Sequence, residues 1–196
     1  MGMSVESPSD PTLSRLSAAL GAVPKRGLPP VERWNPPYCG EIDIRIAGDG
    51  TWHHNGSPIR REKLVKLFAT ILRREPDGRT VLVTPVESVG ITVEDAAFVA
   101  VEMAVDGSGE ARRISFRTNV DDLVSVDAEH ALRFEEGPGG AFKPYLHVRH
   151  GLWALVTRSL TYDLVDLAEE CAIDGKPWLG LWAGGVFHRI APVADA

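Results

Sequence analysis

The sequence predicts an α+β protein composed of two small domains. Three observations indicate this class: strands with one apolar face occur near both ends of the chain, each group of strands includes one amphipathic helix, and further short strands lie between the groups. The 196 residues, 44% of them hydrophobic, are enough for two such domains. We expect a flexible segment over 1–30, an N-terminal α+β domain over 31–97 and a β-rich C-terminal domain with one helix over 98–196.

The first thirty residues are rich in Ser, Pro, Gly and Ala and contain few large apolar side chains. Within them Leu13, Leu16 and Leu20 have helical spacing, so a short helix that ends at Gly21 is expected. Two Pro-Pro pairs in the stretch 28–40 favour extended backbone and prevent a helix. This stretch should form a strap that leads into the folded part.

The N-terminal domain should open with a β-hairpin. Ile42, Ile44 and Ile46 alternate with charged residues, which is the period of a strand with one buried face. Asp49-Gly50 suits the turn, because Gly accepts the positive φ that hairpin turns require. The return strand should run from Thr51 to His54.

A helix is predicted after this hairpin. Ser57 is a typical N-cap and Pro58 fits the first helical position, where a missing N–H costs nothing. The expected apolar stripe consists of Leu64, Leu67, Phe68, Ile71 and Leu72. Asp77-Gly78 should end the helical region, and two strands over about 80–86 and 88–95 complete a strand-strand-helix-strand-strand unit (ββαββ).

The same order of elements is predicted near the C-terminus. Two strands flank Gly151, a helix covers 159–172, and two strands flank Gly184-Gly185. Ile42–Arg45 matches Leu146–Arg149, which favours a duplication, although two amphipathic patterns can also coincide. Between the two units four further strands are expected, at 98–105, 112–119, 123–127 and 131–136.

The charge is unevenly distributed. The net charge is −6, but residues 12–79 contain 12 Lys and Arg against 7 Asp and Glu, whereas residues from 80 onward contain 9 against 18. The two parts can attract each other, or either can attract a charged partner. The basic residues of the predicted helix could contact phosphates of a nucleic acid or nucleotide, and a solvated helix face is the alternative. These residues are Arg60, Arg61, Lys63, Lys66, Arg73 and Arg74.

Metal and nucleophile chemistry receive little support from the sequence. His53 and His54 are neighbours on a strand and point to opposite faces, so they should not share one metal ion. Cys39 has no evident base beside it, and Cys171 falls on the apolar stripe of the predicted second helix, where it should be a core residue. The Gly-rich stretch 136–143 precedes no helix and has no Lys-Ser/Thr, so a turn is favoured over a phosphate loop. No cofactor is expected.

The junction of the two domains is the predicted place for a ligand, because rigid sheets present their strand ends and turns there. The candidate ligand-binding residues are Arg45, Arg60, Glu87, Thr118, Asn119, Arg149 and Arg158. The alternative interpretation is that the arginines form interdomain ion pairs with Glu87 and Asp95 and need no ligand.

Several stretches in combination resemble the bacterial Domain of Unknown Function 1285 family. They are "CGEIDIRIAGDGTWHHNGSPIRREKLVKLF", "LVTPVE" and "VEDAAF" in the first half, and "RTNVDD", "PYLHVR" and "GGVF" in the second. The resemblance covers about residues 31–191. It implies an N-terminal α+β domain followed by a domain loosely like a pleckstrin-homology roll, and a ligand bound between them in a regulatory pathway. The chain departs from the pattern at Ala97, where the family has Pro before Phe98.

These observations favour a non-enzymatic ligand-binding or regulatory protein, with a function in signal transduction as one form of it. The expected partner is a small molecule or an anion. A nucleic-acid-binding accessory protein that uses residues 60–74, or an enzyme with an unrecognised site, are the alternatives. No apolar run is long enough for a membrane partner. Two cysteines without CxxC spacing fit a reducing cytoplasm.

Overall fold

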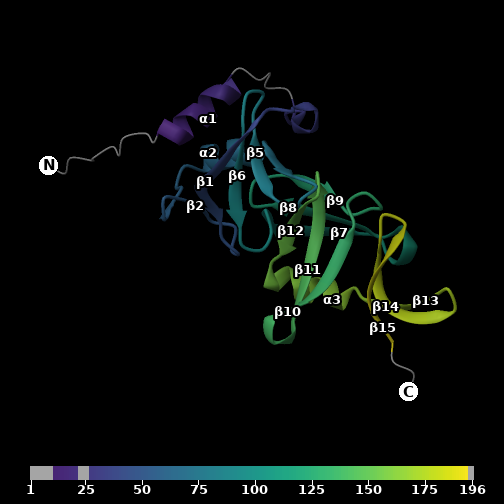
Figure 1. Cartoon of the computed structure of the whole chain (residues 1–196). Helices are drawn as coiled ribbons and strands as arrows, with labels where there is room; N and C mark the ends of the chain where they lie inside the picture. Colours follow the sequence, from purple (N-terminus) through teal and green to yellow (C-terminus); the bar gives the residue numbers. More distant parts are fainter. Residues whose placement is uncertain (1–10, 22–26, 194–196) are drawn as a thin grey trace.

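The computed structural model describes residues 11–21 and 27–193. In these residues the chain forms two six-stranded sheets, a three-stranded sheet and three α-helices (Figure 1). The predicted α+β class is therefore confirmed. No helix in the described part is long and apolar enough to cross a membrane.

The first sheet contains the N-terminal strands in the order β3-β2-β1-β6-β5-β4. Ile44 and Ile46 are buried on one face of its central strand, as their alternation predicts, and Gly50 adopts φ +84° in the turn that follows. The central pair β1 and β6 is parallel, whereas every other neighbouring pair is antiparallel. The strands are β1 (Tyr38–Ile46), β2 (Trp52–His54), β3 (Ser57–Pro58), β4 (Leu72–Arg74), β5 (Thr80–Val83) and β6 (Ser88–Val93).

The second sheet has the order β10-β11-β12-β7-β8-β9, and its central pair β12 and β7 is again parallel. Strands β7 to β10, which come first along the chain, lie where the sequence predicts the four strands between 98 and 136. The strands are β7 (Phe98–Asp106), β8 (Arg113–Thr118), β9 (Leu123–Ser125), β10 (Leu132–Gly137), β11 (Ala141–Arg149) and β12 (Leu152–Val156).

The two six-stranded sheets repeat one topology. If β1 to β6 are matched in order with β7 to β12, the strand order, the antiparallel pairs and the parallel central pair are the same in both. A repeat is therefore present, but not in the register that the sequence suggests. The match of Ile42–Arg45 with Leu146–Arg149 pairs β1 with β11, whereas the topology pairs β1 with β7. Amphipathic strands look alike locally, so their likeness did not identify the repeat.

The second predicted ββαββ set is divided between two sheets. Its first two strands, β11 and β12, belong to the six-stranded sheet, and its last strands belong to a separate small sheet. The small sheet lies at one end of the molecule, beside the C-terminus (Figure 1). It consists of β13 (Glu169–Ile173), β14 (Lys176–Ala183) and β15 (Val186–Pro192).

The helix predicted to start at Ser57 begins later and ends earlier. Ser57 and Pro58 form β3, because the hairpin continues: Ser57 pairs with His54, and the Ile59 N–H donates to the Trp52 carbonyl at 2.7 Å. Helix α2 covers Glu62–Ala69, Ile71 lies in the turn after it, and Leu72 begins strand β4. The prediction of one basic helix over 60–74 is therefore wrong.

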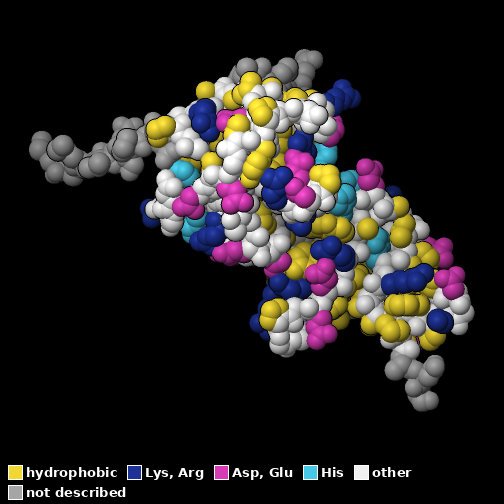
Figure 2. All heavy atoms as spheres, in the orientation of Figure 1, with side chains coloured by type: hydrophobic (Ala, Val, Ile, Leu, Met, Phe, Trp, Pro, Cys, Tyr) yellow, Lys and Arg dark blue, Asp and Glu magenta, His cyan; other side chains and the backbone are white. Residues whose placement is uncertain are grey.

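This correction weakens the nucleic-acid interpretation. Arg73 and Arg74 lie on strand β4, and Arg73 donates to the carbonyls of Val31 and Trp34 at 2.7 and 2.8 Å. The basic side chains of residues 60–74 thus share no single helix face. On the face drawn in Figure 2, Lys and Arg side chains are interspersed with Asp and Glu among the described residues. A continuous basic surface does not form there.

Helix α3 (Arg158–Asp166) is also shorter than predicted. The chain leaves the helix after Asp166, and Glu169–Ile173 pairs with β14. Cys171 is therefore a partly exposed strand residue, and its predicted place in a helix core is wrong. Leu164 of the same stripe is buried, as expected.

One hydrophobic cluster runs through both halves of the molecule. It includes Trp52 and Phe68 of the first half, and Phe98 and Leu146 of the second. The strands of the two halves do not pair with each other, but their apolar faces share this core.

The leucines of α1 (Pro11–Gly21) belong to the same cluster. Leu13, Leu16 and Leu20 are buried. The helix that their spacing predicts is present, and it packs beside α2 (Figure 1). The rest of the segment predicted to be flexible includes 1–10 and 22–26, which lie outside the described residues.

Candidate functional site

Arg149 is a structural residue at the boundary between the domains. Its side chain is 11% exposed, pairs with Asp122 through Nη1, and donates from Nη2 to the Ala69 carbonyl at 3.0 Å. The guanidinium also lies 4.8 Å from the centre of the Phe98 ring. The bond to the Ala69 carbonyl joins the second sheet to the end of α2, whereas Asp122 and Phe98 hold the guanidinium from within the second domain. The cation therefore has acceptors in the fold and is not available to a ligand.

Thr118 and Asn119 shape the turn that meets the first domain. The fully buried Thr118 hydroxyl accepts the Val120 and Asp122 N–H groups at 3.3 and 3.1 Å. Asn119 Oδ1 accepts the Val99 N–H at 3.0 Å, and its Nδ2 lies 3.5 Å from the Gly50 carbonyl oxygen. In the same turn Asp121 pairs with Lys66 of α2 at 2.6 Å. Together these groups form what we call the interdomain seam: Lys66, Asn119, Asp121, Asp122 and Arg149, with the Gly50 and Ala69 carbonyls.

The other predicted residues lie apart from one another. Arg45 pairs with Glu94 inside the first domain. Glu87 pairs with Arg15 of α1, with 3.0 Å between Glu87 Oε1 and Arg15 Nε. Arg60 is exposed and forms no ion pair with the described residues. Arg158 lies on α3. The seven residues therefore do not converge on one ligand site.

A pocket does lie between the two domains, but other side chains form it. Its volume is about 210 Å³, and most of its lining is polar. We call it the junction pocket. It is lined by Arg74, Thr80, Val93, Asp95, Ala96, Ala97, Arg133, Tyr145, Gly151, Leu152 and Trp153.

Asp95 holds one wall of the junction pocket together. Its Oδ1 accepts the Tyr145 hydroxyl at 2.7 Å, and its Oδ2 pairs with Lys143 Nζ. Burial raises the pKa of Tyr145, and the bond to Asp95 raises it further. The bond to Asp95 also raises the pKa of Lys143. At neutral pH Tyr145 is therefore a neutral hydroxyl and Lys143 an ammonium group, and both contact Asp95.

Arg133 and Arg74 contribute positive charge to the lining of the junction pocket. The Arg133 guanidinium lies 4.3 Å from the centre of the Trp153 ring and 5.3 Å from that of Tyr145, and its Nε pairs with Glu135 at 2.8 Å. Arg74 forms no ion pair within residues 11–21 and 27–193. Gly151, in the β11–β12 turn, adopts φ +71°, which favours glycine, and its Cα side faces the Arg74 side chain at ordinary van der Waals distance.

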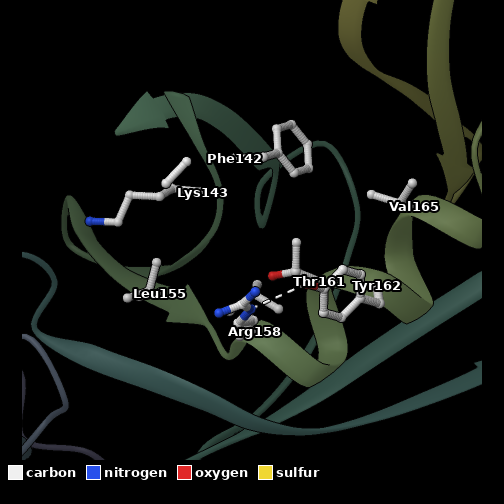
Figure 3. A pocket seen from close by; sticks show the side chains of 9 residues that line it. Phe142, Lys143, Leu155, Arg158, Thr161, Tyr162 and Val165 are labelled. Atoms are coloured by element: carbon white, nitrogen blue, oxygen red, sulfur yellow. Dashed lines mark hydrogen bonds between the residues drawn. The ribbon is translucent and has the colours of Figure 1, made fainter. Parts of the chain in front are cut away.

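A second, larger cavity follows helix α3. It is an open groove of about 540 Å³ with mainly apolar walls from β11, β12 and α3 (Figure 3). We call it the α3 groove. It is lined by Ala141, Phe142, Lys143, Leu155, Val156, Arg158, Thr161, Tyr162 and Val165.

The sequence contained partial signals for these cavities. Asp95 was considered as an ion-pair partner, but its partner is Lys143 instead of an arginine, and Glu87 pairs with Arg15. Lys143 and Tyr145 alternate along β11, which places them on one face of the sheet. Such alternation is also found on any solvated strand, so it did not distinguish a pocket wall.

His53 and His54 lie outside both cavities, and the described residues contain no group of three or more His, Cys, Asp or Glu that could hold a metal ion.

Comparisons with known proteins place the chain in a family. Residues 29–96 match the model of the N-terminal domain of DUF1285, a domain of unknown function, and residues 97–190 match that of its C-terminal domain. A crystal structure of a DUF1285 family protein from Silicibacter pomeroyi DSS-3 is 45% identical, with a TM-score of 0.81 over 91% of this chain and 95% of that chain.

A second crystal structure, of a DUF1285 family protein from Shewanella baltica OS155, is 27% identical over 63% of this chain and 90% of that chain, with a TM-score of 0.49. None of the curated proteins matches the chain. The pleckstrin-homology-like character of the second domain stays a prediction.

Proposed function

This chain belongs to the DUF1285 family, and we propose that it is a non-enzymatic binding protein that holds a small anion in the junction pocket. The support comes from this chain's own residues, because the family carries no established activity and a fold does not determine a function.

The observation that carries the proposal is the position of Arg74. It contributes a cation to a polar pocket between two domains, and no carboxylate in the described part of the chain neutralises it. Arg149, by contrast, is paired with Asp122. An arginine with five donors and no protein acceptor is suited to a carboxylate or a phosphate.

The other wall of the pocket favours binding over proton transfer. Asp95 already accepts from Tyr145 and Lys143, and the raised pKa of Tyr145 keeps its hydroxyl protonated at neutral pH. These groups supply fixed polarity to a ligand. The volume of about 210 Å³ limits the ligand to a small carboxylate or phosphate compound.

A regulatory role follows from the same geometry. Arg74 belongs to the first domain, and Arg133, Tyr145 and Trp153 belong to the second. A ligand held by both sets would stabilise one arrangement of the two domains, because it binds that arrangement more tightly than others. In this form the protein could report the ligand to a signalling partner.

The test combines ligand discovery with one charge-removing pair of variants. Native mass spectrometry of freshly purified protein identifies a co-purified small molecule, and thermal-shift titrations then cover inorganic phosphate, small mono- and dicarboxylates and nucleoside monophosphates. Arg74→Gln should abolish the ligand-induced rise in Tm. Arg60→Gln removes an equally unpaired but remote cation and should leave the rise unchanged.

Equal responses of the two variants would show that the anion responds to net charge and would refute the pocket. A panel in which no anion raises the Tm of the parent protein, together with no co-purified molecule, would refute the binding function itself.

A further inference from the structure

Helix α3 has one face in the hydrophobic core and a second face that lines the α3 groove. Leu160, Leu164 and Leu167 point toward the core, and Leu164 is fully buried. The opposite stripe consists of Arg158, Thr161, Tyr162 and Val165, which have the spacing i, i+3, i+4 and i+7. Tyr162 is 59% exposed and Val165 is 46% exposed, although both are apolar enough to be buried in a core. The second stripe therefore forms a wall of the α3 groove.

The remaining wall of the groove is apolar as well. Phe142, Leu155 and Val156 come from the adjoining strands β11 and β12. In Figure 3 the Phe142 ring lies on one side of the groove, and Thr161 and Tyr162 lie on the other. Burying such side chains under an apolar ligand is favourable, because it removes their surface from water.

The two ends of the α3 groove differ in charge. Lys143 lines the groove, but its ammonium group is paired with Asp95. Arg158 pairs with no carboxylate among the described residues, and its Nε donates to the Tyr162 hydroxyl at 3.2 Å. Seven residues separate Arg158 from Val165, which corresponds to about 10 Å along the helix axis. The groove thus has a cation at one end and only apolar side chains at the other.

We infer that the α3 groove binds a single-chain amphiphile, with the acyl chain along Phe142, Leu155 and Val165 and the carboxylate at Arg158. This inference goes beyond the proposed function, since it concerns a different cavity and a ligand of another chemical class. The volume of about 540 Å³ lies within the usual range for small-molecule sites. The single cation at one end of the apolar α3 groove matches an amphiphile with one anionic end.

Calorimetric titration of the full chain with hexanoate, octanoate and decanoate tests the chain length. Each pair of added methylene groups should lower the Kd by about 15-fold if fully buried, and by about 4-fold if half buried. The gain should stop once the chain outgrows the groove. Octanol should bind more weakly than octanoate, and octylamine more weakly than octanol, because Arg158 repels the amine.

Two variants and two matched controls test the site. Arg158→Gln should raise the Kd of octanoate by about 5-fold and leave octanol unchanged, as expected for an exposed ion pair. Val165→Ser should weaken both ligands. Arg60→Gln and Val86→Ser change an unpaired exposed arginine and an exposed valine outside both cavities, and neither should alter binding.

Vesicles distinguish a free amphiphile from a membrane surface. Flotation with vesicles of anionic phospholipid should leave the protein unbound if the groove takes free carboxylates. Binding to vesicles that depends on Arg158, without saturable binding of free carboxylates, would overturn the inference. So would a Kd that does not change with chain length, or carboxylate binding that Arg74→Gln abolishes and Arg158→Gln leaves intact.

Discussion

Arg149 and Arg74 lie at the same domain boundary, but they have opposite surroundings. Arg149 is largely buried in the interdomain seam, where a carboxylate, a carbonyl and an aromatic ring contact its guanidinium. Arg74 lines the junction pocket and has no ion-pair partner among the described residues. The difference shows that a cation at an interface becomes available to a ligand only where the fold leaves it without an acceptor. Mutation of the seam should therefore lower stability, and mutation of the junction pocket should remove the anion binding that we propose for it.

The largest effect is expected at Arg149. Arg149→Ala should lower the free energy of unfolding by about 3 kcal/mol, because Asp122 loses its partner in a poorly solvated position and the Ala69 carbonyl loses a donor. Urea denaturation measures the change. Arg113→Ala removes an arginine that is 79% exposed and should change the free energy of unfolding far less than Arg149→Ala does. Similar losses in both variants would contradict a special role for the seam.

Gly50 tests how closely the two domains approach each other at the seam. Gly50→Ala should cost about 2 to 3 kcal/mol, because the added Cβ would lie 2.8 Å from both Asn119 Nδ2 and Val99 Cγ2 and because φ is +84°. Gly56→Ala is the matched control, since its φ is +74° and nothing lies within 4 Å of the added Cβ. It should cost about 1 kcal/mol. The difference between the two variants, measured by thermal unfolding, reports the crowding alone.

Lys66 should contribute little, although it belongs to the same seam. Its side chain is 38% exposed and that of Asp121 is 51% exposed, so water screens their 2.6 Å pair. A double-mutant cycle with Lys66→Gln and Asp121→Asn should give a small coupling energy that decreases with salt. A coupling energy as large as the effect of Arg149→Ala, or one insensitive to salt, would show that exposure does not separate Lys66 from Arg149.

The smallest effect is a pH dependence at His188, a buried residue that joins the small sheet to β10 and lies near the charge of Asp127. Its Nδ1 accepts the Leu132 N–H at 3.2 Å, and burial lowers its pKa. Because the unfolded chain then takes up a proton more readily, its contribution to stability is complete above about pH 6.5 and is lost as the pH falls below that value. Urea denaturation between pH 7 and 5.5 should therefore give a flatter profile for His188→Gln than for the parent protein. Parallel profiles would contradict this assignment.

The sequence predicted elements better than it predicted partners. The alternation of Ile42, Ile44 and Ile46 defined β1, because a strand with one buried face has a simple period. Ile71 and Leu72 were misassigned, because their spacing fits a helix stripe and a buried strand equally well. Ser57-Pro58 was misread as a helix start for the same reason: the residues that cap helices also occur where hairpins end.

Side-chain partners lie beyond such local patterns. Lys143 pairs with Asp95, 48 residues away, and Arg149 pairs with Asp122, 27 residues away. Nothing near either residue in the chain marks the other. The sequence therefore indicated a junction between domains and left its arginines open to a ligand or to ion pairs with Glu87 and Asp95. It did not identify Asp122 and Glu94 as the acceptors of Arg149 and Arg45.

The parallel central pair of each six-stranded sheet has a consequence for how the protein folds. In the first sheet β1 pairs with β6, and in the second β7 pairs with β12, so the first and last strands of each repeat lie side by side. Neither sheet can be completed until its last strand has been synthesised and inserted at the centre. Contacts of such high sequence separation slow folding, because the loop must close before the strands gain from pairing. During synthesis on the ribosome, each domain should therefore stay incompletely folded until its final strand has emerged, and should then assemble cooperatively.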